Sequence, residues 1–232
     1  MAKDAKKHQK KLQKQSAKRK KKRTLSSQRS ALMATPALSR VKSWPLEEAW
    51  ISEGWRRPDD LIQAIFSRRS PNGHLAFGGV MVDPKCLGVK DAYGRVDTYE
   101  TYRMILGGMK SVQTLVETDI DVIAKVIRDS IQYARTLGIE PHKELRDALM
   151  VLGKANPDSV PGEMGFGGPE GKPLYIAGPR DNVNQILKTL RRTVGQEGFD
   201  YVLPLEMIDD MKLDDINLSR AKIIEVEGEQ DA

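Results

Sequence analysis

The sequence of 232 residues contains a single cysteine, Cys86, and only three histidines. One cysteine cannot form an internal disulfide, so nothing here indicates an oxidising compartment. Without closely spaced Cys and His residues, and without a His-Glu-x-x-His motif, we expect no metal site. We also expect no cofactor. The glycine-rich stretch 165–173 is not a phosphate loop, because Phe166 replaces its first glycine and Pro173 replaces its hydroxyl residue.

Long apolar runs are also missing. No segment approaches the roughly 20 apolar residues of a transmembrane helix. The basic stretch near the start is not followed by the apolar run of a secretory signal. We therefore expect a cytoplasmic protein that makes no membrane contact.

The charge lies mainly at the two ends of the chain. Residues 1–30 hold 13 basic side chains and one acidic one, and residues 206–232 hold three basic and nine acidic ones. Residues 31–205 hold 22 of each sign. The chain therefore divides into a disordered basic tail with its linker (1–43), an α+β globular domain (44–205) and an acidic C-terminal segment (206–232) that could include a short strand.

From Lys3 to Arg23 the basic tail contains one large aliphatic residue, Leu12, and no aromatic residue. So little apolar area cannot offset the entropy of folding, so we expect disorder in water. Lys and Arg side chains bind phosphates by releasing counterions, and without aromatic stacking this binding ignores base sequence. Cytosolic RNA, including the ribosome, is the expected target. The predicted phosphate-binding residues are Lys6, Lys7, Lys10, Lys11, Lys14, Lys18, Arg19, Lys20, Lys21, Lys22 and Arg23.

Two β-prone runs, 61–69 and 74–83, are joined by a turn containing Asn-Gly, which predicts a β-hairpin. A third strand is expected from Cys86 to Val96. Because a hairpin leaves no room for a crossover helix, these strands predict an antiparallel sheet. Further strands are expected at 172–177, 201–205 and 221–227.

Helices are predicted between these strands. One is expected to begin at Asp97, as the cap, and to end at Gly107-Gly108. Apolar residues at intervals of three and four predict another over 120–134, followed by Gly138, and a short connection leads to a second helix with Pro141 in its first turn. A last helix, capped by Asp181, follows. The fold class is therefore α+β: an antiparallel sheet packed with a helical hairpin and additional helices.

Four side chains are candidates for catalysis: Cys86, Lys90, Asp91 and His142. They offer a thiol, an amine, a carboxylate and an imidazole, which can act as nucleophile or proton carrier. In a regular strand Asp91 would point away from Cys86 and Lys90, so the first three could cooperate only through a bulge or another element. His142 is expected in the first turn of its helix.

The acidic segment contains a cluster made of Asp209, Asp210, Asp214 and Asp215. It lacks the alternating carboxylates and central glycine of a calcium loop. We interpret it as a solvated face or a docking site for a basic partner, which could be this chain's own tail.

Three stretches carry a resemblance: Cys86-Leu87-Gly88-Val89-Lys90-Asp91-Ala92, Leu137-Gly138-Ile139-Glu140-Pro141-His142, and 171–179, which reads Gly-Lys-Pro-Leu-Tyr-Ile-Ala-Gly-Pro. They are similar to an uncharacterised family of bacterial proteins, over roughly residues 44–205. The resemblance implies a bacterial, cytosolic origin and a single α+β unit. It transfers no catalytic residue.

The main hypothesis is an RNA-associated or ribosome-associated binding protein that uses its polycationic tail without base specificity. One alternative is an enzyme, a hydrolase or a nucleic-acid-processing activity, with its site around Lys90, Asp91 and His142. Another is a protein interaction module with a solubilising tail.

Overall fold

The computed structural model of the protein describes residues 38–204 and 221–224. A five-stranded sheet runs in the order β4-β3-β2-β1-β5, and every neighbouring pair in it is antiparallel. Its strands are β1 (Leu46–Ser52), β2 (Ile62–Arg69), β3 (Leu75–Asp83), β4 (Gly88–Asp97) and β5 (Leu115–Glu117). The α+β fold, with its antiparallel sheet and the predicted hairpin, is therefore confirmed.

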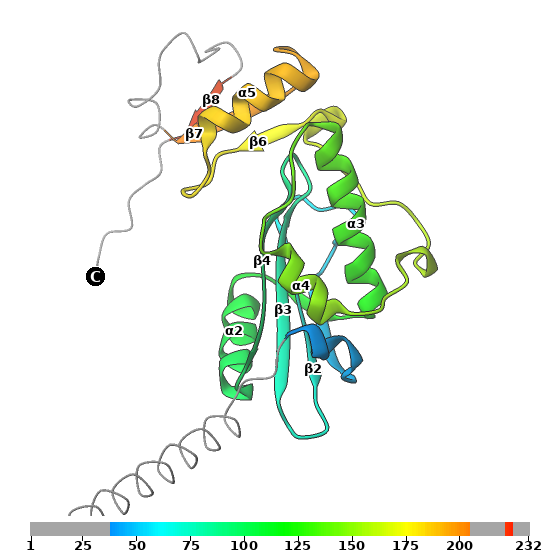
Figure 1. Ribbon diagram of the computed structural model, residues 1–232. Coiled ribbons are helices and arrows are strands. Elements are labelled where there is room, and N and C mark those ends of the chain that lie inside the picture. Colours follow the sequence, from blue (N-terminus) through cyan, green and yellow to red (C-terminus); the bar gives the residue numbers. More distant parts are fainter. Residues whose placement is uncertain (1–37, 205–220, 225–232) are drawn as a thin grey trace, which may run out of the picture. The chain divides into compact units, whose positions relative to one another are not determined.

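Helices cover both faces of this sheet (Figure 1). Helices α3 (Ile120–Thr136) and α4 (Leu145–Leu152) pack on one face, in a core that includes Ile62, Phe66 and Val80. Helix α2 (Tyr99–Val112) packs on the other, where Tyr102 and Leu106 meet Phe77. The alternation of side chains along each strand assigns apolar residues to both faces, which explains the nearly continuous burial of β2 and β3.

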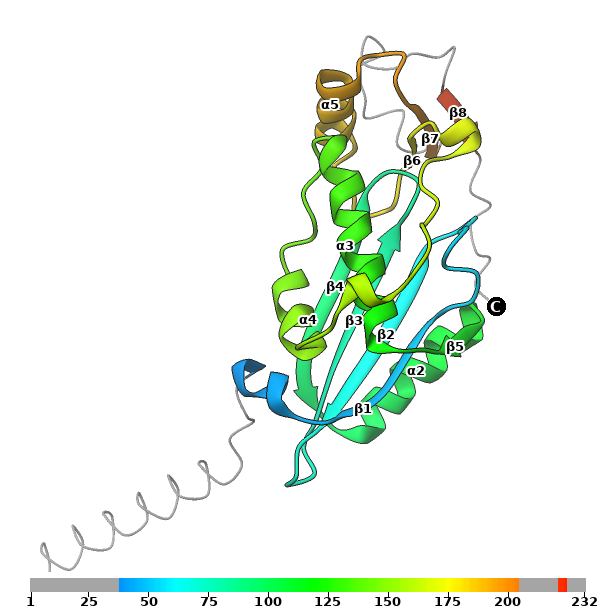
Figure 2. The same cartoon turned by 90° about the vertical axis from the view of Figure 1, so that its right-hand side faces the viewer.

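A second, smaller sheet is parallel, which the sequence did not predict. It contains β6 (Leu174–Ile176), β7 (Asp200–Pro204) and β8 (Ala221–Ile224), in that order, and α5 (Val183–Val194) connects β6 to β7. Figure 2 shows this unit at one end of the large sheet. Its core includes Tyr175, Leu187 and Leu203. The short strand predicted within the acidic segment is confirmed as β8.

Several predicted boundaries were wrong. The cap of α2 is Thr98 rather than Asp97, and α2 continues through Gly107-Gly108 to Val112. Both glycines are exposed, and a Cβ at either would meet no atom within 4 Å. Pro141 is not in the first turn of α4, because that helix begins at Leu145.

Three other expectations differ from the structure. Asn182, not Asp181, caps α5. Cys86 lies in the turn before β4, not in the strand. Residues assigned to the linker form the 3-10 helix η1 (Leu38–Ser43), whose Val41 is fully buried, so this part of the chain belongs to the core.

One buried cation holds η1 and α4 against the sheet. The guanidinium of Arg68 on β2 donates to the carbonyl oxygens of Val151 at 2.6 Å, Leu152 at 2.7 Å and Trp44 at 2.8 Å. Two of these carbonyls belong to the last turn of α4, where the helix dipole favours a positive charge. Burial lowers the pKa of Arg68, yet arginine stays charged in proteins. Gly153, with φ +70°, ends the helix beside it.

Replacing Arg68 by alanine should therefore lower the free energy of unfolding by about 3 kcal/mol or more, because three buried carbonyls lose a charged donor. Lysine should not restore the loss, since an ammonium does not reproduce the guanidinium fork. Urea denaturation, monitored by circular dichroism, measures the free energy of unfolding of both variants. The neighbour Arg69, whose ion pair with Glu47 is about one-third exposed, provides the control. Arg69→Ala should cost less than about 1 kcal/mol. Equal costs for the two alanine variants would contradict this role for Arg68.

Candidate functional site

An open groove of about 650 Å³ runs along the outer side of α4. Four cations line it: Lys42 from η1, and Lys143, Arg146 and Lys154 from α4 and its flanks. The other lining residues are Pro141, His142, Leu145, Leu149, Met150 and Gly153. None of these ten described residues is acidic. The groove therefore offers positive charge around a partly apolar floor, in a chain segment whose total charge is neutral.

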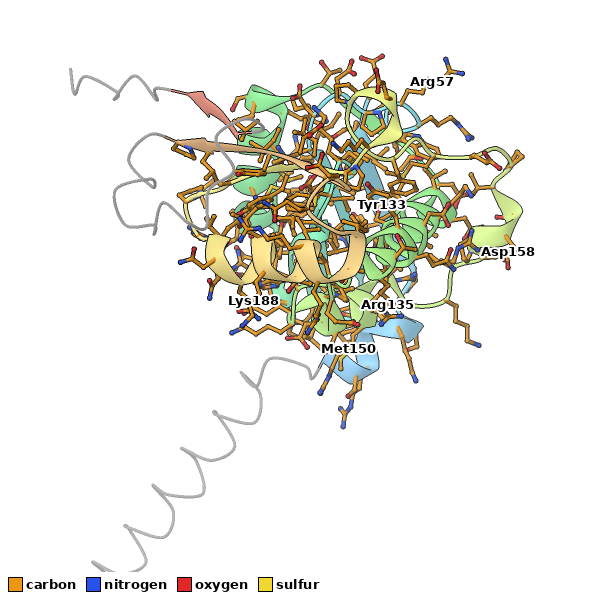
Figure 3. All side chains as sticks on the ribbon, turned by 90° about the horizontal axis from the view of Figure 1, so that it is seen from above. Arg57, Tyr133, Arg135, Met150, Asp158 and Lys188 are labelled. Atoms are coloured by element: carbon orange, nitrogen blue, oxygen red, sulfur yellow. The ribbon has the colours of Figure 1, made fainter. Side chains whose placement is uncertain are left out.

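The sequence of α4 explains how these side chains reach the groove. Leu145, Ala148, Val151 and Leu152 are buried against the sheet. Their spacing leaves Arg146, Leu149 and Met150 on the opposite side of the helix. Figure 3 labels Met150 close to the ribbon of η1, the helix that contributes Lys42. Gly94 of β4 allows α4 to pack close to this strand, because a Cβ there would lie 2.2 Å from the carbonyl oxygen of Asp147.

His142 lies at one end of the groove and Asp91 faces it. The backbone N–H of His142 donates to the carbonyl of Val89 at 3.1 Å, which places the residue at the edge of β4. Its Nδ1 lies 3.9 Å from Oδ1 of Asp91 and accepts from the N–H of Glu144 at 3.4 Å. Because Nδ1 accepts this hydrogen bond, the neutral ring carries its hydrogen on Nε2.

Lys90 belongs to a different cluster. In the β3–β4 ladder Met81 pairs with Asp91 and Val82 pairs with Val89, so Lys90 is the extra residue of a β-bulge. Its Nζ lies 2.9 Å from Oδ2 of Asp181, and the two side chains are 17% and 10% exposed.

Asp181 accepts hydrogen bonds from two further donors. Its Oδ2 accepts the N–H of Gly178 at 2.8 Å and the hydroxyl of Tyr175 at 3.2 Å. Burial and the nearby Asp181 carboxylate raise the pKa of Tyr175, which therefore remains a donor. The cluster joins β4 of the large sheet to the loop between β6 and α5. We interpret it as an ionic contact between the two sheets.

The turn before β4 completes this junction. Asp83 is buried, and its carboxylate accepts backbone N–H groups from Lys85, Cys86 and Leu87 at 2.9–3.2 Å. The carbonyl oxygen of Lys85 accepts from Leu174 of β6 and from the hydroxyl of Tyr133 on α3, the residue labelled in Figure 3. One short turn therefore connects three elements.

The four catalytic candidates therefore lie in separate parts of the structure. Asp91 and His142 are brought together, whereas Lys90 pairs with Asp181. Cys86 is fully buried, and burial raises the pKa of its thiol. A nucleophilic cysteine needs a thiolate and access to substrate, and Cys86 has neither. The predicted enzymatic site around Lys90, Asp91 and His142 is assembled only in part.

The phosphate-binding residues predicted in the tail, Lys6 to Arg23, lie outside the described residues, as does the acidic cluster 209–215. Sequence reasoning missed three residues that matter here, Lys42, Arg68 and Asp83, and it interpreted Asp181 only as a helix cap. The Asp83-Pro84 pair after a strand is a turn motif that could have indicated the Asp83 cap. For Lys42, Arg68 and the true role of Asp181 the sequence contains no local signal, because their partners lie far away along the chain.

No helix within residues 38–204 is long and apolar enough to cross a membrane. Across the described ranges, no group of three or more His, Cys, Asp or Glu side chains is placed to hold a metal ion.

Comparisons of the chain with protein-family models, with curated proteins and with solved structures found no match. The resemblance to a bacterial family therefore stays a prediction, and function has to be argued from the geometry.

The ion pair between Lys90 and Asp181 should contribute measurably to stability. Asp181→Asn leaves the ammonium of Lys90 without its carboxylate, at a cost of about 3 kcal/mol. In a double-mutant cycle with Lys90→Met, urea denaturation should give a coupling energy above about 1 kcal/mol. The exposed pair Arg135–Glu140 is the matched control, with a coupling expected below about 0.5 kcal/mol. Additive effects at Lys90 and Asp181 would show that the contact is incidental.

Asp83 should make stability depend on pH. Burial raises its pKa in the folded protein, despite three N–H donors that act in the opposite direction. At pH values between the unfolded pKa of about 3.9 and the higher folded pKa, the folded state binds more protons than the unfolded state. The free energy of unfolding contributed by this group therefore falls as pH rises through that window. Subtracting the urea-denaturation profile of Asp83→Asn from that of the wild type, from pH 4 upward, isolates the effect. A difference that increases with pH would contradict it.

Proposed function

We propose that this protein binds RNA, and that the groove along α4 contacts the phosphate backbone. The observation that carries the proposal is the groove itself, in which Lys42, Lys143, Arg146 and Lys154 gather while no acidic residue is among the described residues that line it. Phosphate contacts from Lys and Arg supply most of the affinity in nonspecific nucleic-acid binding.

The geometry supports a phosphate chain better than a single anion. The groove is open and follows a helix of eight residues, so its cations are spread along a line rather than directed at one point. Leu149, which is 41% exposed, and Met150 provide apolar floor between them. Ribose rings can pack on such a floor while the phosphates meet the ammonium and guanidinium groups.

The basic tail extends the same chemistry. Residues 1–30 carry a net charge of +12 and precede η1, which contributes Lys42 to the groove. In this proposal the tail supplies long-range attraction and the groove supplies a defined contact surface. A cytoplasmic location and an association with the ribosome, the most abundant RNA there, are parts of this proposal.

The groove should determine the salt dependence of RNA binding. For a single-stranded RNA, replacing the four groove cations with glutamine should reduce the slope of log affinity against log salt by about 3, because each lost phosphate contact removes about 0.7. Fluorescence anisotropy with a labelled oligouridylate, between about 50 and 200 mM salt, measures the slope.

A matched variant separates the groove from net charge. Arg57, Arg103, Lys188 and Arg192 are exposed and do not line the groove; Figure 3 labels two of them, Arg57 and Lys188. Changing these four to glutamine alters net charge equally and should reduce the slope by less than about 1. If both quadruple variants weaken binding alike, the groove is not the contact surface and the proposal fails.

A further inference from the structure

A second hollow, of about 190 Å³, lies on the other side of β4, between the sheet and α2. Its apolar lining includes Met81, Ile105 and Met109, and its polar lining consists of Gln63, Asp91 and Tyr93. Asp91 and Tyr93 are two residues apart on β4, so both point to the same face of the sheet. Across the strands, Asp91 pairs with Met81 and Met81 pairs with Gln63. The thioether therefore lies between a carboxylate and an amide.

Tyr93 lines this pocket, and its hydroxyl is an unused hydrogen-bond donor within the described parts of the chain. It pairs with Gly79 across the ladder, and a Cβ on that glycine would lie 2.5 Å from the phenol oxygen. The ring thus occupies the space that glycine leaves open. Its hydroxyl is buried and has no hydrogen-bond partner within the described parts of the chain. Burial raises the pKa of Tyr93 to about 12, so the hydroxyl keeps its proton at neutral pH. Buried hydroxyls in proteins normally have a partner.

Asp91 connects this pocket to the groove. Its Oδ1 accepts the N–H of Ala92 at 2.8 Å and lies 3.9 Å from Nδ1 of His142, which lines the groove. The side chain is 48% exposed, so the carboxylate is accessible from solvent. A phosphate chain in the groove therefore passes the edge of β4 beside the pocket. The pocket is smaller than the roughly 300 Å³ typical of the smallest drug-sized sites. It has room for one ring system, while the sugar and phosphate stay outside.

We propose that this pocket receives one base of the bound RNA and that the preferred base is guanine. This inference rests on the proposed RNA binding and adds base specificity to it. Guanine presents two neighbouring N–H donors, N1–H and the exocyclic amino group, which a carboxylate such as Asp91 can accept together. Its O6 is an acceptor for the hydroxyl of Tyr93 or the amide of Gln63. The flat ring packs against the sulfur atoms of Met81 and Met109.

The same groups select against other bases. Adenine places an acceptor nitrogen beside its amino group, where it would face the carboxylate of Asp91. Uracil has one N–H between two carbonyl acceptors, so it repels the same carboxylate. Inosine keeps N1–H and O6 but lacks the exocyclic amino group, so it tests the second hydrogen bond to Asp91 alone.

The test measures the affinity of the full chain for four labelled octamers by fluorescence anisotropy. One is octauridylate, and the others carry a single guanosine, inosine or adenosine at the fourth position. We expect the guanosine octamer to bind at least about fivefold more tightly than octauridylate, from one bidentate contact. Inosine should fall between them, and adenosine should bind no better than uridine.

Two variants assign the preference to the pocket. Asp91→Asn should abolish it while affinity for octauridylate stays the same or rises, because a negative charge near the groove is removed. Tyr93→Phe should reduce the preference several-fold and should fold normally, since it deletes a hydroxyl without a partner. Asp60→Asn, an exposed carboxylate outside the pocket, should change neither quantity.

The outcomes separate this inference from the proposed function. Equal affinities for all four octamers, with the salt slope still reduced by the groove variant, would overturn the guanine pocket and leave RNA binding intact. A guanosine preference that survives both Asp91→Asn and Tyr93→Phe would place base recognition elsewhere and also overturn it. If the guanosine preference persists but the groove variant leaves the salt slope unchanged, the guanine pocket stands. The groove is then not the surface that contacts the phosphates.

Discussion

The arrangement of this domain depends on a buried guanidinium that has no carboxylate partner among the residues the structure describes. Arg68 binds three backbone carbonyls from two segments, at 2.6–2.8 Å. Desolvating a charge is costly, and carbonyl oxygens at the end of a helix are among the few neutral groups that compensate it. Because both segments must be present for Arg68 to be satisfied, η1 and α4 are held in register with β2. The groove between Lys42 and α4 exists as a consequence of this contact.

The sequence predicted the elements whose determinants are local. The Asn-Gly turn between two β-prone runs specified the hairpin of β2 and β3, and the spacing of Ile120, Ile123 and Ile127 specified α3. The predicted elements were wrong where tertiary packing overrode a local sequence pattern. Gly107-Gly108 resembles a helix stop, but Leu106 and Met109 pack on the sheet and carry α2 past it. The three residues of β5 are too few to show a periodicity, and their pairing with β1 specifies them.

The candidate site was less predictable, because each of its parts is assembled from distant segments. Asp91 and His142 were both recognised as chemically capable, but only the connection after α3 brings the imidazole to the edge of β4. Lys90 leaves that pair because the bulge in β4 directs it toward Asp181, 91 residues later in the chain. A bulge depends on the register of two strands, and nothing in the run Val89-Lys90-Asp91 specifies it. The sequence also misassigned Lys42 to a linker, because its partners lie far away along the chain.

A body with equal numbers of both charges can still attract a polyanion if it separates them in space. Opposite charges at a distance beyond roughly 8–10 Å are screened by salt, so an RNA strand responds to the nearest cations and not to the total. Elsewhere on this domain acidic side chains pair with basic ones, for example around α3, where Asp129 and Asp158 pair with Arg128. The cations of the groove face solvent without such neutralisation among its lining residues. In the proposed function, net charge sets how strongly the chain is drawn to RNA at long range, and this local grouping of cations decides where the strand lies.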